Sequence, residues 1–511
     1  MKTIKILYIA GALAFGSQSC SSEFLELTPK SSVTTGNFYK TQDQFNQALT
    51  GAYASIRNAK GSVASWVMGE MRSDNTFYEY NNQNRGTGLL EREDTDSFLD
   101  NYTSSYISDK YNSCYVGIAR VNQILGNLES ATLSEDFKID IAAQAKFIRA
   151  LLYFELVRYF GGVPLHLSAV TGAEEAYHNR STAEEVYEAI EADLQEVIQR
   201  IPVVSFPQNG RVTKGAARVL LADVLITQKK YAEAEAELKA VTEMGYMLLP
   251  DYADVFDVNH KNSKESLFEI QYQEGDQGQH SDFVYHFLPL SADVSLITGI
   301  TSQNRNAGGW NVPTEDLMEA YEVGDKRLEA SIAIAEGVGP VGAMVIETLA
   351  SPVDYVTPLG KRSYPFIKKY LSPHSIQNNT GNNFPIYRYA DVLLLLAEAL
   401  NEQGKAQEAM DYLNPVRERA GLNPITNADV NALREVILHE RRIEFAFENK
   451  RWLDLVRTGK AVEVMNSHGE KLKAKYQHLN VLSYHVIPER LLYPIPQREI
   501  LIGNLTQNPG Y

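Results

Sequence analysis

Apolar residues recur three or four positions apart along much of the chain, the spacing that places them on one face of an α-helix. In residues 104–128 the apolar positions at this spacing are Tyr111, Cys114, Ile118, Val121, Leu125 and Leu128. The same pattern predicts helices over 138–160 and 182–200. Thr182 followed by Glu185 is typical of a capping box at the start of the second of these helices.

One internal repeat is visible in the hydrophobic pattern. "VLLADVLITQKKYAEAEAELKAV" (219–241) aligns without gaps on "LLLAEALNEQGKAQEAMDYLNPV" (394–416). Each copy predicts two helices joined by a tight turn, the unit of tetratricopeptide-like repeats, which must stack on neighbours to bury its apolar face. We expect Ala222 and Ala397, which occupy equivalent positions, at close helix–helix contacts. Pro415 removes a helix hydrogen bond, so we expect a kink or restart near Asn414.

Two further helix pairs extend the scaffold. Residues 433–460 predict a hairpin that turns near Asn449, and 138–160 is expected to pair with 182–200. The predicted fold is therefore mainly α, a tetratricopeptide-like scaffold of about four helix pairs with long irregular loops and little β structure.

Two segments interrupt this pattern, at about 72–98 and 245–385. They are rich in Gly, Asn, Asp, Pro and aromatic residues and show little periodicity. Disordered segments are poor in aromatic residues, so we expect ordered loops laid over the helices. Long ordered loops on a rigid frame are where binding residues usually lie.

The N-terminus is typical of an export signal. Lys2 and Lys5 precede ten apolar residues, too few to span a bilayer as a helix, and small residues follow. The stretch "GSQSC" is similar to a bacterial lipobox, which predicts a signal peptide over 1–19, lipidation of Cys20 and a single domain over 20–511. The alternative is a secreted protein in which Cys20 is incidental. If Cys20 is acylated, Cys114 has no disulfide partner. The helical pattern around Cys114 predicts a buried small hydrophobe.

The charge of the chain limits its partners. Its formal net charge is −16, which becomes more negative once the two signal lysines are removed. Such a surface repels nucleic acid and anionic headgroups. We therefore expect no nucleic-acid partner, and membrane attachment only through the N-terminal lipid.

No motif predicts catalysis, a cofactor or a metal site. "GVGPVG" (337–342) has the spacing of a dinucleotide loop, but Pro340 lies inside it and Pro352 follows too soon for the required helix and strand. "HERRIE" (439–444) begins like a zinc-binding helix, but Ile443 stands where a second histidine is needed. Arg441, Arg442 and Glu444 are expected to form ion pairs instead. A pair of carboxylates for glycoside hydrolysis would meet only in space, so a surface hydrolase stays open as a distant alternative.

The loops suggest a binding site for a neutral polar ligand, because flat rings pack on the apolar faces of sugars while polar groups bind the hydroxyls. Trp310 and Tyr78 are the predicted stacking platforms. The predicted hydroxyl partners are Arg72, Asp74, Asn75 and Arg305. Trp66 and Trp452 are expected to be buried.

Several segments in order resemble the SusD/RagB family of nutrient-binding lipoproteins of the Bacteroidetes outer membrane. They include "FLELTPKSSVTTGNFYKTQDQFNQALTGAYASIR" (24–57), "AKFIRALLYFELVRYFGGVPL" (145–165), "YRYADVLLLLAEALN" (387–401) and "ERRIEFAFENKRWLDLVRTG" (440–459). Within these motifs Tyr153, Arg158, Glu444 and Trp452 are expected to serve packing and ion pairing.

The resemblance implies a surface-exposed lipoprotein of the outer membrane that is not an enzyme. It would bind oligosaccharide and deliver it to a SusC-like TonB-dependent transporter. A protein of the same fold that binds peptides for uptake is the main alternative. The resemblance transfers no ligand contact, because the family's contacts lie in variable loops.

Overall fold

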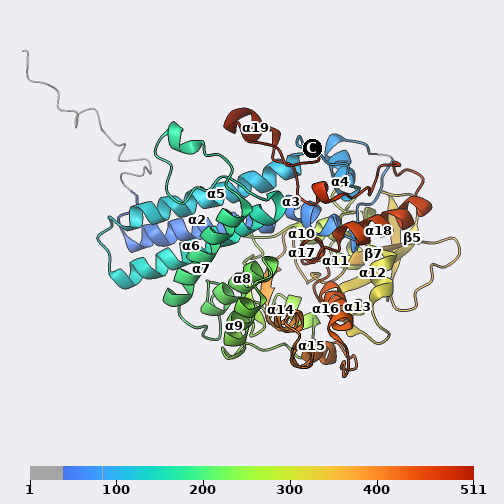
Figure 1. Ribbon diagram of the computed structural model, residues 1–511. Helices are drawn as coiled ribbons and strands as arrows, with labels where there is room; N and C mark the ends of the chain where they lie inside the picture. Colours follow the sequence, from blue (N-terminus) through green and yellow to red (C-terminus); the bar gives the residue numbers. More distant parts are fainter. Residues whose placement is uncertain (1–37, 83) are drawn as a thin grey trace, which may run out of the picture.

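The computed structural model of the protein describes residues 38–82 and 84–511. Helices account for 50% of it and strands for 9%. Figure 1 shows the helices of the N-terminal half stacked on one side, with the strands gathered on the other. The prediction of a mainly helical fold with little β structure is confirmed.

The N-terminal half forms a layer of long helices. The long helices are α2 (Gln42–Lys60), α5 (Ser105–Leu128), α6 (Glu135–Phe160) and α7 (Ala183–Arg200). Shorter elements between them are α3 (Val63–Ser65), the π-helical η2 (Trp66–Met71), α4 (Thr87–Asp96) and the 3-10 turn η3 (Ala173–Ala176). The predicted capping box at Thr182 and Glu185 begins α7. Helix α7 packs along α6, and α5 packs against α2 and α6, as the apolar pattern predicts. Cys114 is buried in α5.

The internal repeat forms two stacked helix pairs. They are α8 (Lys214–Thr227) with α9 (Tyr231–Thr242), and α14 (Tyr389–Glu402) with α15 (Ala406–Arg419). Helix α14 packs on α9, so the two pairs stack, and Ala222 and Ala397 are both 0% exposed. The prediction of close contacts at these alanines is confirmed. The restart expected near Asn414 is not observed: α15 continues through Pro415, where the buried Leu413 and Val416 anchor it on both sides.

The C-terminal part adds α16 (Val430–Glu444), α17 (Arg451–Arg457), α18 (Ala461–Lys475), the 3-10 turn η5 (Pro488–Arg490) and α19 (Gln497–Gly503). The chain reverses between α16 and α17, where Asn449 has a φ of 58°, so the predicted hairpin near this residue is confirmed. Trp452 in α17 and Trp66 in η2 are each 1% exposed, as expected.

The segment between the two repeats is ordered, as its aromatic content predicts. Its strands are β2 (Ser266–Ile270), β3 (Ser291–Asp293), β4 (Val312–Pro313), β5 (Ile332–Val338), β6 (Met344–Ala350), β7 (Arg362–Ile367) and, at its end, β8 (Phe384–Arg388). Its helices are η4 (Ala253–Phe256), α10 (Phe283–Phe287), α11 (Ser295–Thr298), α12 (Glu315–Ala320) and α13 (Lys326–Ser331). A further strand, β1 (Thr76–Phe77), belongs to the 72–98 segment.

The strands form one small sheet and two ribbons. The sheet has the order β3-β6-β5-β7, and the ribbons pair β2 with β8 and β1 with β4. In the β1–β4 ribbon Phe77 lies opposite Val312. "GVGPVG" forms the end of β5 and the turn into β6, where Gly339 and Gly342 have positive φ, so it is a hairpin turn and not a nucleotide loop.

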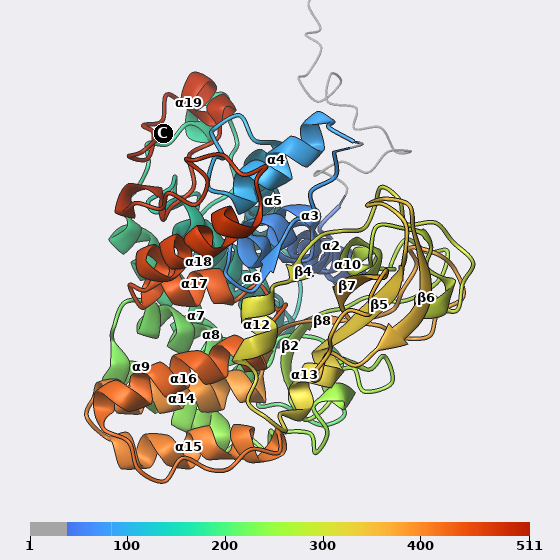
Figure 2. The ribbon, with the colours of Figure 1, turned by 90° about the vertical axis from the view of Figure 1, so that its right-hand side faces the viewer.

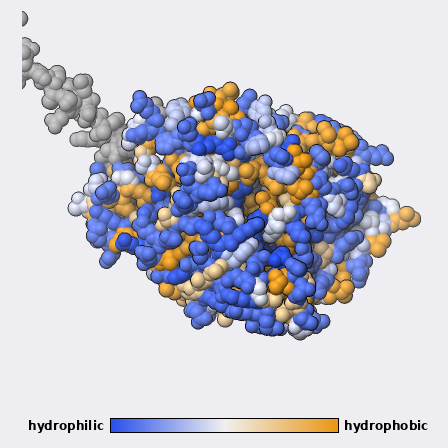
Figure 3. All heavy atoms as spheres, in the orientation of Figure 1, coloured by the Kyte–Doolittle hydropathy of each residue, from blue (hydrophilic) through white to orange (hydrophobic). Residues whose placement is uncertain are grey.

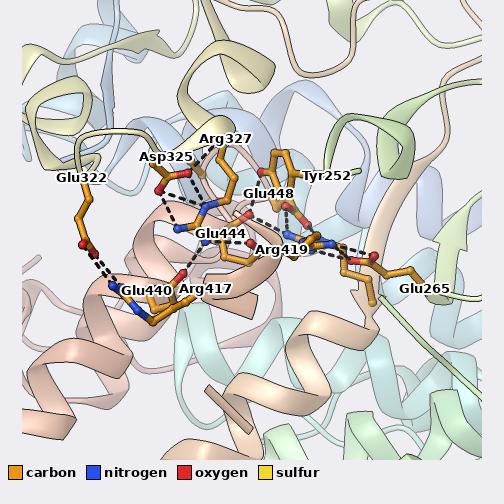
Figure 4. Close-up of polar contacts among 12 residues, drawn as sticks. Tyr252, Glu265, Glu322, Asp325, Arg327, Arg417, Arg419, Glu440, Glu444 and Glu448 are labelled. Carbon is orange, nitrogen blue, oxygen red and sulfur yellow. Dashed lines mark hydrogen bonds and ion pairs between the residues drawn. The ribbon is translucent and has the colours of Figure 1, made fainter. Parts of the chain in front are cut away.

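A buried network of ion pairs ties this segment to the repeat helices (Figure 4). Arg388, at the start of α14, contacts Glu444 at 2.5 Å, Glu448 at 2.8 Å and Glu265 at 3.1 Å. Arg327 of α13 contacts Glu440 and Glu444 of α16. These carboxylates and guanidinium groups are nearly inaccessible to solvent. Burial of so many charges requires that each is paired, which fixes how the segment sits on the helices.

Other residues that were expected to form ion pairs also form them. Arg441 pairs with Asp454, Arg442 with Asp316, and Arg158 with Glu155. Tyr153, from the same motif as Arg158, is 1% exposed. None of the described helices is both long enough and apolar enough to cross a bilayer. Cys20 lies outside the described residues.

Candidate ligand-binding groove

A groove runs between the strand segment and the C-terminal helices. Its larger part is a hollow of about 660 Å³, and a smaller hollow of about 220 Å³ shares its lining at Phe77, Arg362 and Tyr476. Figure 2 shows α12 between α18 and the sheet that carries β5 and β7, and these elements supply much of the wall. We call this feature the aromatic groove. Its aromatic and imidazole side chains are Phe77, Tyr78, Tyr80, Tyr355, Tyr364, His468, Tyr476, His478 and Tyr484.

Four of these rings form a continuous ladder. Phe77 packs against Tyr476 with ring centroids 6.2 Å apart, and Tyr476 lies 5.8 Å from His478. His478 stacks on Tyr80 at 3.9 Å with an interplanar angle of 14°. The ladder joins the chain after η2 to the chain that leaves α18, two segments about 400 residues apart in the sequence. None of these four rings is fully buried, so the ladder presents aromatic surface to solvent.

The groove also contains three ion pairs. Arg362 of β7 donates to Glu79 at 2.9 Å, Lys471 of α18 to Asp316 of α12 at 2.5 Å, and Lys475 to Glu315 at 2.6 Å. Burial raises the pKa of Glu79, and Arg362 opposes that shift. Burial also raises the pKa of Asp316, but hydrogen bonds from Lys471 and Arg442 outweigh it and hold the pKa below its usual value. Two of the pairs link α18 to α12, so they hold the walls as well as lining them.

Asp96, at the end of α4, differs from these carboxylates. It lines the smaller hollow, has no ion-pair partner among the described residues and accepts a hydrogen bond from the backbone of Tyr78 at 3.1 Å. Burial raises its pKa to about 8. Asp96 is therefore mainly protonated at neutral pH, and this end of the groove carries an uncharged acid.

The two predicted stacking rings lie together, directly behind the groove. Trp310 and Tyr78 meet edge to face with centroids 6.4 Å apart, and Tyr78 lines the smaller hollow. Trp310 is 2% exposed. The Arg92 guanidinium lies over its ring at 3.9 Å and donates to the hydroxyls of Tyr78 and Tyr106. Trp310 is thus covered by protein in this structure, whereas Tyr78 borders a hollow.

Three of the predicted hydroxyl partners lie inside the scaffold. Arg72 pairs with the buried Asp100, and its guanidinium lies 4.2 Å from the ring centroid of Tyr493. Asp74 accepts from Arg451 at 2.8 and 2.9 Å.

Asn75 completes this buried set: its side chain donates to Glu70 and accepts from Arg442. Arg72, Asp74 and Asn75 are each at most 2% exposed. The expectation that they meet a ligand is therefore corrected to a structural role, since buried charges require the protein partners that they have here.

Arg305 is the one predicted partner at the surface. Its side chain is exposed, and its backbone lies against Gly342 in the β5–β6 turn, close to Asn81. Val341 of the same turn lines the smaller hollow, so Arg305 belongs to the rim of the aromatic groove. Its contact with a ligand stays a prediction.

Most of the groove could not be predicted from the sequence. Tyr476 and His478 lie in "KYQHLN", just beyond α18, with no pattern that relates them to Phe77. Glu79 and Arg362 are 283 residues apart and pair only in the fold. The one available signal was the aromatic run "FYEY" (77–80), of which only Tyr78 was selected.

A second cavity lies among the N-terminal helices. It has about 420 Å³ and is bounded by α5, the 164–178 loop and α19, with Tyr115, His166, Tyr177 and His178 in its lining. Burial and the neighbouring His178 lower the pKa of His166. This cavity is smaller than the larger hollow of the aromatic groove. Its rings Tyr111, Tyr115, His166 and His178 also contact one another in order, with centroids 4.8, 5.9 and 4.6 Å apart, but none of these pairs is stacked in parallel and Tyr111 is buried. Among residues 38–82 and 84–511, no three His, Cys, Asp or Glu side chains are placed to hold a metal ion.

Most of the face in Figure 3 is hydrophilic, and its apolar residues are scattered in patches among charged ones. The aromatic groove is distinguished from such patches by the order of its rings. A row of rings beside charged and hydroxyl groups can pack on one face of a flat ligand and hydrogen-bond its edges.

The chain matches known proteins over nearly its whole length. The family model described as "SusD family" matches residues 264–511, and the model described as "Starch-binding associating with outer membrane" matches residues 23–226. SusD-like protein P2 of Formosa agariphila is 29% identical, over the whole of both chains.

Solved structures agree. A laminarin-binding SusD-like protein is 26% identical with a TM-score of 0.72, over 93% of this chain and 100% of its own. A SusD superfamily protein from Parabacteroides distasonis is also 26% identical, with a TM-score of 0.74 over 94% of this chain and 100% of its own.

Proposed function

The chain belongs to the SusD/RagB family, and from this premise we propose that it is a cell-surface lipoprotein that binds oligosaccharide and delivers it to a TonB-dependent outer-membrane transporter. Members of this family are non-catalytic glycan-binding proteins, in agreement with the expectation that the chain is not an enzyme. The family description also refers to association with the outer membrane. We place the binding site in the aromatic groove.

The observation that carries this placement is the ladder of Phe77, Tyr476, His478 and Tyr80. Successive sugars of an oligosaccharide present C–H faces that pack on aromatic rings. A row of rings therefore fits several linked sugars better than one ring would. Arg362, Glu79 and the hydroxyl of Ser363 border the ladder and can exchange hydrogen bonds with sugar hydroxyls.

Three residues predicted from the sequence, Tyr78, Trp310 and Arg305, lie near this ladder. Tyr78 stays in the proposed site because it lines the smaller hollow, with Trp310 supporting it from behind. Arg305 stays at the rim. A relative whose title describes laminarin binding supports a polysaccharide ligand over a peptide.

Tyr476→Ala is expected to weaken oligosaccharide binding by about 2 kcal/mol or more, because central aromatic residues are typical binding hot spots. That loss corresponds to about thirtyfold or more in Kd. A glycan array with the soluble chain from Ser21 onward selects the ligand, and calorimetry measures the affinity. Circular dichroism and thermal unfolding establish that the variant keeps its fold.

Tyr177→Ala is the matched control, because Tyr177 is 57% exposed and lines the cavity among the N-terminal helices. Its affinity should equal that of the unchanged protein. A loss of binding in Tyr177→Ala with none in Tyr476→Ala would transfer the site to that cavity. A chain that binds peptides and no glycan would favour the peptide-uptake alternative.

Delivery to a transporter rests on the family resemblance. We expect the protein to co-purify with a TonB-dependent outer-membrane barrel when native membranes are extracted in mild detergent. The barrel itself should still fold and insert in cells that lack this protein. Recovery of the protein alone, while its transporter is expressed in the same membranes, would count against this half of the proposal.

A further inference from the structure

We infer that the aromatic groove selects uncharged saccharides and rejects those that carry uronate or sulfate groups. This inference rests on the proposed function, since it concerns the ligand of the same groove. It follows from how the charges of the groove are arranged, which the sequence does not reveal.

Each cationic side chain that lines the groove already has a carboxylate partner. Arg362 is held by Glu79 at 2.9 Å, Lys471 by Asp316 at 2.5 Å and Lys475 by Glu315 at 2.6 Å. The two histidines that line it, His468 and His478, have pKa values lowered by burial and stay uncharged at neutral pH. No lysine or arginine that lines either hollow is left to pair with an anionic sugar, whereas Arg305 lies outside this lining, at the rim.

One carboxylate is left over. Glu319 lies on α12, lines the larger hollow and is exposed, and no hydrogen bond or ion pair engages its side chain in the described part of the chain. The groove therefore carries a slight excess of negative charge, within a protein whose net charge is −16. That field repels an anionic polymer before contact.

An anionic sugar beside one of these cations would compete with the carboxylate that the cation already holds. At Arg362 it would replace Glu79, whose side chain is 13% exposed and would be left without its partner. Leaving a largely buried charge unpaired is strongly unfavourable. At Lys471 and Lys475 it would separate α18 from α12, the two helices whose pairs hold this wall.

An uncharged saccharide meets no such obstacle. A carboxylate engaged by one cation keeps further lone pairs, and an ammonium group keeps further N–H donors. Sugar hydroxyls can donate to Glu79 or Glu319 and accept from Lys471 while every pair stays intact. The protonated carboxyl of Asp96 adds a neutral donor at the far end.

Affinity gel electrophoresis of the soluble chain from Ser21 onward tests this selectivity. The neutral gels contain laminarin, galactomannan or xyloglucan, and the anionic gels contain alginate, polygalacturonate or carrageenan. At low salt, at least one neutral polymer should retard the protein and no anionic polymer should. Retardation by an anionic polymer would overturn the inference and leave the proposed function in place. Retardation by neither class would count against glycan binding itself, and the inference would fail with it.

Freeing a cation should reverse the selectivity. Glu79→Gln leaves Arg362 without its carboxylate, and Glu315→Gln does the same for Lys475 on the exposed surface of α12. Each variant should gain about tenfold in affinity for the anionic polymers at low salt, because local electrostatic attraction is restored, and the gain should vanish at high salt. Binding of neutral polymers should persist in Glu315→Gln, because the proposed site makes no use of that carboxylate. The exposed Glu315→Gln keeps the test valid if Glu79→Gln fails to fold.

Glu237→Gln is the matched control. It removes the same charge from a partly exposed pair with Arg218, on α9 and α8, away from the groove. It should behave as the unchanged protein toward both classes of polymer. If both groove variants stay as inert toward anionic polymers as Glu237→Gln, ion pairing does not exclude those ligands, and the inference is overturned.

Discussion

Glu444→Ala is expected to lower the free energy of unfolding by about 3–5 kcal/mol, the cost of breaking a buried charge network by removing one partner. Glu444 is fully buried in α16, and its carboxylate accepts hydrogen bonds from Arg388, Arg327 and Arg419. Alanine would leave these three guanidinium groups with fewer partners and no water to replace the lost one. Urea unfolding monitored by circular dichroism measures the change.

Glu135→Ala is the control for this prediction. Glu135 pairs with Lys138 one helical turn away, and its side chain is 80% exposed. Exposed pairs of this kind contribute about 0.5 kcal/mol, so this variant should unfold almost as the parent does. If both variants lose the same small amount, the buried network does not hold the strand segment on the helices, and our account of the fold is wrong.

The pH dependence of stability gives the same network a second test. Burial alone would raise the pKa of Glu444, but Arg419, Arg388 and Arg327 outweigh it and hold the pKa well below its usual range. A depressed folded-state pKa stabilises the protein above the unfolded-state value of about 4.3. That stabilisation is lost as the pH falls further. Glu444→Gln carries no such charge, so its stability should fall less steeply than that of the parent between neutral pH and pH 3.

The helical scaffold could be predicted because its signal is local. Helices α5 and α7 each bury one face at a spacing of three or four residues, α6 is buried on nearly all sides over its second half, and the repeat shows which faces stack. Ala222 and Ala397 were identified by alignment alone and are both fully buried. The restart expected near Asn414 was wrong because that argument counted one hydrogen bond and neglected the packing of its neighbours, whereas the kink stays a prediction.

The two ribbons could not be predicted, because their paired strands are distant in the sequence. Strand β2 pairs with β8, more than a hundred residues later, and none of the strands exceeds seven residues. A run so short shows no clear period. The sheet becomes apparent only when the buried ion pairs fix the segment against α14 and α16, and those pairs join residues from separate parts of the chain.

Three of the predicted ligand contacts were wrong for a related reason. Arg72, Asp74 and Asn75 form a polar cluster that resembles an exposed loop in the sequence. Asp100 and Arg451, which neutralise two of them, cannot be recognised as partners without the fold. The rings of the ladder likewise come from segments about 400 residues apart. Tyr78 was predicted because polar residues precede it in the sequence, whereas nothing in the sequence relates Tyr476 to that segment.

Cys20→Ala is expected to abolish membrane attachment while leaving the folded domain intact. The motif "GSQSC" after a short apolar run predicts acylation of this cysteine, and several acyl chains on one residue contribute about 0.8 kcal/mol per buried methylene. No described helix is able to cross a bilayer, and the net charge of −16 disfavours binding to anionic headgroups.

Fractionation of the variant, together with metabolic labelling by a radioactive fatty acid, measures this effect. The parent should carry label and sediment with membranes, whereas Cys20→Ala should carry none and stay in the soluble fraction. Cys114→Ala is the control, because that thiol is buried inside α5. This variant keeps Cys20, so it should carry label and sediment with membranes as the parent does. The soluble Cys20→Ala protein should bind oligosaccharide with the parent's affinity, since the aromatic groove lies wholly within residues 77–484. Sedimentation of Cys20→Ala with membranes, or a parent without label, would mean that this cysteine is not the anchor and that the cell-surface half of the proposed function needs another attachment.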